Sequence, residues 1–311
     1  TNASSEAATI SSASRIQAGG REPGKNRKFS WTTACTFTKT KNKVIELMDG
    51  LTEYSLGSAD GDNIRYLIKE GTAMGDFYTP TWQKIAEGPL AGEPLLDQNG
   101  RYQRNESEYV KAGNYNPDFM VGFSNTFTYK NLSLNILLDA RSGGDFYSYV
   151  VKSLLNAGLT TNTLAGRDEQ SGGLGWTDSE GRQRQDGMII YGYIQQDDGS
   201  YTLNKNIIAA SDYYESTYNK YYERLTYDAS FIKLREASLT YVFNQKTLGK
   251  LPLYNLSISI IGRNLYNWTK NKLGYDPETT MSIASDGFKQ GVGHWTLPGT
   301  RSYGAKLSFN F

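Results

Sequence analysis

The chain has 311 residues, 38% of them hydrophobic, and 33 Lys and Arg against 32 Asp and Glu leave a net charge of +1. Without a long basic run, a nucleic-acid partner is not expected. The single Cys35 and the single His294 exclude an internal disulfide framework and cysteine-rich or histidine-rich metal centres, so we expect no metal and no cofactor.

Composition alone does not decide whether the chain inserts into a membrane. No run of about 18 apolar residues predicts a transmembrane helix, but a transmembrane β-strand needs only about 10 residues of alternating pattern. The 23 Tyr and 32 Gly suit a barrel of such strands. The chain begins with Thr1, so we expect part of a longer protein, and we predict residues 1–28 to be a loop or a partial strand.

Alternation of apolar and polar residues with a period of two predicts six β-strands. They cover residues 29–38, 119–129, 132–141, 231–243, 256–266 and 303–311. The side chains expected to share an apolar face, directed away from a lumen into lipid, are Phe119, Val121, Phe123, Phe127, Leu132, Leu134, Ile136, Leu138, Leu239, Leu256, Ile258, Leu307 and Phe309. Cys35 lies on the same side of its strand, which favours a lipid-facing thiol over a catalytic one.

The connections alternate strictly in length. Segments 39–118, 142–230 and 267–301 are long, whereas 130–131 and 244–255 are short. Outer-membrane barrels have short periplasmic turns and long extracellular loops, while compact soluble domains seldom carry such loops. The predicted fold is therefore all-β, a portion of a transmembrane antiparallel β-barrel with long extracellular loops, whose further strands lie outside this chain.

Several segments resemble a known family. The runs "GNYNPDFMVGFSNTFTYKNLSLNILLDARSGGDFYSY", "YDASFIKLREASLTYVF", "ISIIGRNLYNWTKNKLGYDPE" and "PGTRSYGAKLSFNF" are similar to the C-terminal barrel of the SusC-like (RagA-type) TonB-linked outer-membrane transporters. The likeness covers residues 29–311. Members of that family usually have one more strand before the Phe-Ser-Trp segment, and the run "AGGREPGKNRKFSW" of this chain looks shortened at that point.

The resemblance implies a location and partners. It implies the C-terminal part of a bacterial outer-membrane barrel that imports an oligosaccharide or peptide, with a SusD-like lipoprotein as lid and membrane lipid around it. The plug, and with it the contact to the TonB complex, would belong to an N-terminal part absent from this chain. The closing strand with Phe309 and Phe311 would act as the assembly signal, with Phe311 in an aromatic girdle.

Aromatic residues in the long connections are the candidate substrate contacts, because exposed rings beside polar groups can stack on sugars or grip peptides. They are Trp176, Tyr191, Tyr193, Tyr213, Tyr214, Tyr218, Tyr221 and Tyr222. The competing interpretation is that these rings pack the loops together or contact the lid.

Other polar residues have ordinary structural interpretations. Arg263 and Glu236 fall on the lumen or plug side of their strands, where a structural ion pair is favoured over a substrate role for Arg263. Asp97 begins a calcium-like loop, but Arg101 replaces an expected acidic residue, which favours a simple turn. His294 is expected to be a loop residue.

Two functional hypotheses remain. The preferred one is a transport barrel. The alternative is a soluble or surface-attached β-rich module that binds glycan and buries the same apolar residues in a sandwich core. No carboxylate pair and no nucleophile with a base stands out, so an enzyme is not expected.

Overall fold

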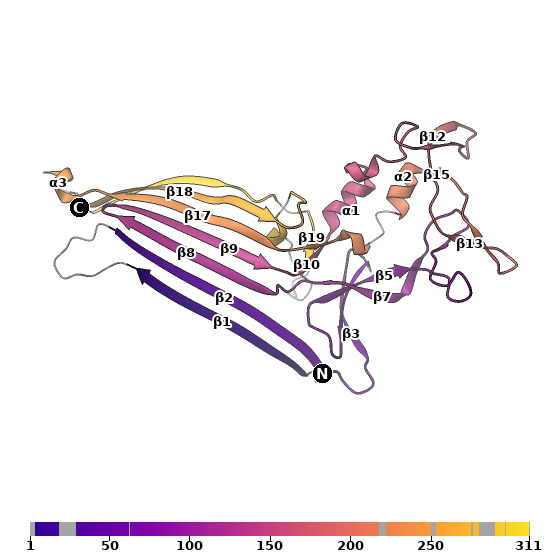
Figure 1. Ribbon diagram of the computed structural model, residues 1–311, viewed down its shortest axis with the longest axis horizontal. Coiled ribbons are helices and arrows are strands. Elements are labelled where there is room, and N and C mark those ends of the chain that lie inside the picture. The colour runs from indigo at the N-terminus through magenta and orange to yellow at the C-terminus, as the bar shows by residue number, and fades with distance from the viewer. Residues whose placement is uncertain are drawn as a thin grey trace.

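The computed structural model describes residues 4–18, 29–61, 63–217, 222–249, 253–274, 276–279, 290–295 and 297–310. A long sheet fills one end of the molecule, and the folded loops gather at the other (Figure 1). Within the described ranges, no helix is long and apolar enough to cross a membrane.

The long sheet is antiparallel and has seven strands in the order β1-β2-β8-β9-β17-β18-β20. Their bounds are Ser4–Ala18 for β1, Phe29–Glu46 for β2, Phe119–Tyr129 for β8, Leu132–Ser142 for β9, Phe231–Val242 for β17, Tyr254–Thr269 for β18 and Ser302–Asn310 for β20. The six predicted strands are confirmed. In the described part of the chain, β1 and β20 are the edges of the sheet, which is open and forms no closed barrel.

Strand β1 lies in the segment expected to be a loop or a partial strand. It pairs along β2, with Ala18 opposite Trp31 and Ser5 opposite Val44. This pairing supplies a strand before the Phe-Ser-Trp segment, although the sequence before that segment looks shortened relative to the family.

One face of the sheet is apolar. The register places Phe123 opposite Leu138, Leu134 opposite Leu239, and Leu239 opposite Ile260. None of the residues predicted for this face is buried, and Ile260 and Leu307 are 64% and 59% exposed. The shared face is thus confirmed, and the described strands do not form the sandwich core of the alternative hypothesis.

The opposite face is polar and bonds to itself across the strands. Thr126 Oγ1 donates to Asn135 Oδ1 at 2.8 Å, and Asn135 Nδ2 donates to Ser238 Oγ at 3.4 Å. The hydroxyls of Thr240 and Ser259 lie 2.8 Å apart. Such cross-strand pairs stabilise a sheet and hold its register.

Short and long connections lie at opposite ends of the sheet, as predicted (Figure 1). The turn between β8 and β9 has two residues, and Lys130 adopts a φ of +54°, as tight hairpin turns require. Asn131 Nδ2 donates to the Val242 carbonyl at 2.6 Å, which ties this turn to β17. Helix α3 (Gln245–Leu248) and the C-terminal end of β20 lie at the same end.

The first long connection contains β3 (Glu53–Ala59), β4 (Ile64–Lys69), β5 (Asp76–Trp82), β6 (Leu95–Leu96) and β7 (Arg104–Asn114). The second contains β10 (Asp145–Ser148), α1 (Tyr149–Asn156), η1 (Thr161–Thr163), β11 (Leu174–Thr177), β12 (Gln183–Met188), β13 (Tyr193–Gln195), β14 (Tyr201–Leu203), β15 (Ile208–Ala209), α2 (Ala210–Asp212), η2 (Tyr213–Thr217), η4 (Tyr222–Leu225) and β16 (Thr226–Asp228). The third contains η5 (Pro277–Thr279) and β19 (Val292–Gly293).

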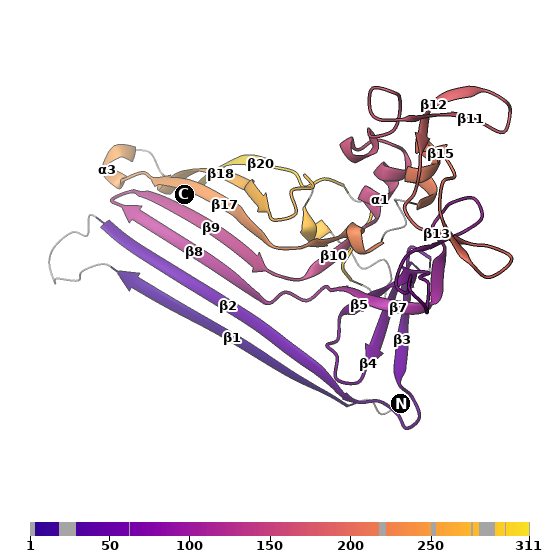
Figure 2. The same ribbon diagram turned by 45° about the vertical axis from the view of Figure 1, so that its right-hand side comes forward.

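These connections fold together as one body (Figure 2). Strand β10 pairs with β16 and with β19 of the third connection, and β13 pairs with β6 of the first. A common core takes Tyr66 and Phe77 from the first connection, Tyr147 and Leu155 from the second, and Val292 from the third. Each such buried side chain contributes roughly 1.5–3 kcal/mol, which offsets the entropy of ordering long loops.

Candidate functional site

Tyr191 and Tyr193 come together at the loop end. Their rings meet edge to face with centroids 6.3 Å apart. The Tyr191 hydroxyl donates to Glu93 Oε2 at 2.8 Å, and this hydrogen bond to a carboxylate raises the pKa of Tyr191 to about 12. The Tyr191 side chain is 58% exposed, so its ring is accessible while its hydroxyl is occupied.

Trp176 lies in a different small sheet, where it is only partly exposed. Its indole Nε1 donates to Asp186 Oδ1 at 3.0 Å, and the Arg184 guanidinium lies 5.7 Å from the ring centroid. Arg184 also pairs with Asp186 and lowers the pKa of that carboxyl to about 2. The polar atom of Trp176 therefore holds β11 to β12.

The tyrosines of residues 213–222 give a mixed outcome. Tyr214 is 5% exposed, and its hydroxyl donates to the Ala165 carbonyl at 3.0 Å, so the prediction of a ligand contact at Tyr214 is wrong and the residue packs the loops. Tyr213 meets it edge to face and is partly buried against a second core that contains Ile194. Tyr218 and Tyr221, and the side chain of Tyr222, lie outside the described residues.

Arg263 and Glu236 form an ion pair with each other, a partnership that the sequence analysis did not name. Arg263 Nε donates to Glu236 Oε2 at 2.9 Å, between β18 and β17 on the polar face. Both side chains keep substantial exposure. An exposed pair of this kind stabilises by about 0–1 kcal/mol and fixes register more than stability.

The calcium-like loop and the histidine also have structural roles. Asp97 Oδ1 accepts hydrogen bonds from the backbone N–H groups of Asn99 and Arg101 at 2.9 and 2.8 Å, which is a turn. Arg101 pairs with Asp212. His294 stacks on Tyr149 at 4.5 Å. Among the described residues, no cluster of His, Cys, Asp or Glu could hold a metal ion.

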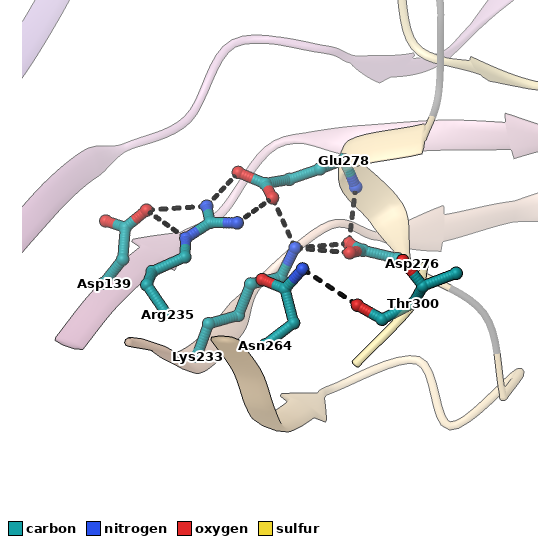
Figure 3. Close-up of polar contacts among 7 residues, drawn as sticks. All are labelled: Asp139, Lys233, Arg235, Asn264, Asp276, Glu278 and Thr300. Carbon is teal, nitrogen blue, oxygen red and sulfur yellow. Dashed lines mark hydrogen bonds and ion pairs between the residues drawn. The ribbon is translucent and has the colours of Figure 1, made fainter. Parts of the chain in front are cut away.

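An ion network on the polar face escaped the sequence analysis (Figure 3). Lys233 of β17 is 3% exposed and donates to both oxygens of Asp276, at 2.6 and 2.5 Å, and to Glu278. Arg235 bridges Glu278 and Asp139, with Nη1 2.6 Å from Glu278 Oε2 and Nη2 2.7 Å from Asp139 Oδ2. The third connection is thus fastened to the wall of the sheet.

The pKa of Glu278 reflects its hydrogen bonds to the two cations of the network. Burial raises the pKa of the carboxyl, but hydrogen bonds from Arg235 and Lys233 outweigh burial and leave the pKa below its ordinary value. No signal in the sequence marked the cationic half of the network. Parity with Leu239 places Lys233 and Arg235 on the apolar side of the predicted strand, but the register shift at Arg235 puts Lys233 opposite Asp139 on the polar face.

A groove of about 530 Å³ lies beside this network. One wall is the end of β18 with Tyr266 and Asn267, and the other is the segment that carries Trp295, Leu297 and Arg301. Asn264 Nδ2 donates to the Thr300 carbonyl at 3.1 Å and closes one end (Figure 3). The volume of the groove falls in the range of pockets that bind small ligands.

No family model matches the chain. TonB-dependent receptor P3 of Formosa agariphila is 24% identical over 306 residues, which cover 92% of this chain and 27% of that protein. TonB-dependent receptor P39 of the same organism is 26% identical over 310 residues, covering 83% and 26%. The resemblance to TonB-dependent receptors is confirmed.

Solved structures agree on the fold. The RagAB peptide importer in its open-open state matches with a TM-score of 0.57 and 16% identity, covering 99% of this chain and 29% of that chain. A second RagAB structure, of the peptide transporter, gives a TM-score of 0.55. The chain spans about a quarter of the length of the two TonB-dependent receptors, 27% of P3 and 26% of P39.

Proposed function

We propose that this chain is the C-terminal barrel portion of a SusC-like TonB-dependent receptor, which imports a bulky nutrient, an oligosaccharide or a peptide, across the bacterial outer membrane. One observation carries the proposal. The sheet exposes an apolar face, bonds its polar face internally, and sends every long connection to one end. That arrangement suits a barrel wall between lipid and a polar lumen.

The proposed partners come from the resemblance to SusC-like transporters and from the RagAB neighbours. Lipid covers the apolar face, a SusD-like lipoprotein closes over the loop end, and Arg263 and Glu236 face the lumen and the plug. The exposed ring of Tyr191 and the partly exposed rings of Tyr193 and Trp176 remain candidate substrate contacts. Coupling to the TonB complex belongs to other parts of the receptor, because the chain described here forms wall and loops.

Adjacent residues of β2 provide the test. Cys35 lies on the apolar face and Ala34 on the polar face at the same depth. In a receptor whose only thiol is Cys35, an attached bimane should be quenched by brominated lipid in reconstituted vesicles. With Cys35→Ser and Ala34→Cys combined, lipid quenching should be lost and an aqueous quencher should act instead.

Equal quenching by lipid at both positions, or at neither, would contradict the barrel wall. Import is tested in cells that depend on the receptor for uptake of an oligosaccharide or peptide. Uptake should stop when TonB is removed, while the amount of receptor in the outer membrane stays constant. TonB-independent growth would refute energised import.

A further inference from the structure

Strand β18 extends beyond its neighbour. It has 16 residues, whereas β20 has 9, and their last pair is Arg263 with Ser302. A transmembrane strand needs about 9–11 residues, so the end of β18 exceeds what a crossing requires. In the described part of the chain, residues 266–269 pair with β17 on one side and with no strand on the other.

The unpaired edge of β18 does not pair as a strand with the segment 297–301 that faces it across the groove. Asn264 adopts a φ of +52° at an irregularity in the register, and its side-chain amide, not its backbone, reaches the Thr300 carbonyl. On the other flank, Lys233 fixes Asp276 (Figure 3). These two anchors keep the groove open beside a strand edge, and alternate residues of such an edge present free N–H and C=O groups.

The lining of the groove offers a positive charge and exposed apolar surface to a ligand. Lys233 is neutralised by Asp276 and Glu278, whereas Arg301 has no carboxylate partner among the described residues. The large side chains in the lining are open to solvent, with Tyr266 at 55%, Trp295 at 60% and Leu297 at 89% exposure. The groove thus combines an unpaired cation, exposed apolar surface and a strand edge.

We propose that this groove binds an extended, acidic peptide segment. Its main chain adds as a strand to residues 266–269, and a carboxylate of the peptide pairs with Arg301. The inference rests on the proposed import function and chooses between its two substrate classes. An oligosaccharide could stack on Trp295 and Tyr266, but it has no repeating amide to match a strand edge, whereas a peptide matches it residue by residue.

The test uses the purified full-length receptor and the fluorescein-labelled hexapeptide Thr-Val-Thr-Val-Thr-Asp. Fluorescence anisotropy should show saturable binding. Methylating alternate backbone nitrogens should weaken binding by at least about tenfold, because strand addition needs those N–H groups. Replacing the peptide's aspartate by asparagine, or Arg301→Gln in the receptor, should each weaken binding about tenfold, and the two changes together should add little.

Two glycine substitutions provide a matched control for the groove. A Cβ at Gly299 would meet only Asp276 Oδ2, at 3.8 Å, so Gly299→Leu should fold and fill the groove. A Cβ at Gly304 in β20 meets nothing within 4 Å, so Gly304→Leu should leave binding unchanged. Gly299→Leu should abolish peptide binding.

Several results would overturn the proposal. They are full binding of the methylated peptide, full binding by Gly299→Leu, no peptide binding at all, or displacement of the peptide by a neutral oligosaccharide in a Trp295-dependent manner. Any of these with TonB-dependent uptake intact would refute the peptide groove alone. Loss of TonB-dependent uptake in the parent receptor would refute the proposed function itself.

Discussion

Single residues carry the connection between wall and loops. Glu278 accepts hydrogen bonds from Lys233 and Arg235, and Asp276 both pairs with Lys233 and accepts from the Glu278 backbone N–H at 2.9 Å. Because Lys233 is nearly buried, its two carboxylates satisfy a charge that would otherwise be costly to desolvate. The turn that carries them is therefore anchored by charge.

We predict that Glu278→Gln loosens this turn. Losing a hydrogen-bonded carboxylate beside buried cations costs on the order of 1–3 kcal/mol. In the membrane-inserted receptor, amide hydrogen exchange in residues 270–279 should accelerate about tenfold or more, since 1.4 kcal/mol corresponds to a factor of ten. Glu236→Gln, which removes the exposed partner of Arg263, should leave the same segment unchanged. Equal acceleration in both variants would contradict the anchor.

The same anchor has a defined pH dependence. The folded pKa of Glu278 lies below its ordinary value, so its contribution to stability is present above the ordinary pKa and is lost as the pH falls through the folded pKa. Protection factors of residues 270–279 in the parent receptor, with the intrinsic exchange rate at each pH divided out, should stay high at neutral pH. They should fall only in acid, below the ordinary pKa of a Glu carboxyl.

Parity in the sequence placed Glu236 and Arg263 on the polar sides of their strands but did not name them as partners. Their ion pair depends on the register of β17 against β18, which the sequence pattern does not give. The two carboxylates that pair with Lys233 come from a turn more than forty residues later in the chain. No periodicity in the sequence indicates which part of the sheet such a turn will contact. Tyr214 shows the converse, because ring burial in a loop depends on contacts that sequence does not reveal.

At the scale of elements, period-two alternation located the six long strands because one face is uniformly apolar. For strand β1 only a loop or a partial strand could be predicted, since "SSEAATISSASRIQA" is built from small and polar residues that give no contrast between faces. The two-residue pairings of β10 with β19 and of β6 with β13 were also beyond reach. Each joins different connections, and only the folded loop body brings them together.

We predict that Phe77→Ala unfolds the loop body while the sheet survives. Phe77 is 1% exposed in the core shared by the three connections, and removing such a ring typically costs about 3–5 kcal/mol. Limited proteolysis of the outer-membrane receptor should cut all three connections, while heat-modifiable migration on gels is retained. Phe123→Ala, on the apolar face at 42% exposure, should leave the loops resistant. Cleavage confined to residues 47–118 would show that the cores are independent.

At the scale of the whole molecule, two long-range features of the sequence predicted the same architecture. Alternating connection lengths and a shared apolar face predicted an outer-membrane wall, and the described strands have that arrangement. Strand β20 ends at Asn310 beside the short connections, with Phe309 42% exposed on the apolar face. Phe311 lies outside the described residues, so its role in assembly stays a prediction.

In the full-length receptor, we predict that Phe311→Lys lowers the amount of protein in the outer membrane more than the uptake rate per inserted molecule. A charged residue at the end of the last strand would disturb pairing and the aromatic girdle, whereas substrate meets loops and lumen. Quantitative blots of outer-membrane fractions, combined with uptake assays, separate the two quantities. Normal insertion with lost uptake would place the terminus in the transport path.

The common core of the three connections restricts how this protein can diversify. Tyr66, Tyr147 and Val292 come from three separate stretches of the chain yet pack in one cluster, and the Tyr66 hydroxyl donates to the Gln290 carbonyl at 2.8 Å. Grafting one connection from a homologue would therefore leave mismatched side-chain volumes where it meets the other two connections. New specificity can arise by recombination only when all three stretches are exchanged together, or by point changes on their outer rims.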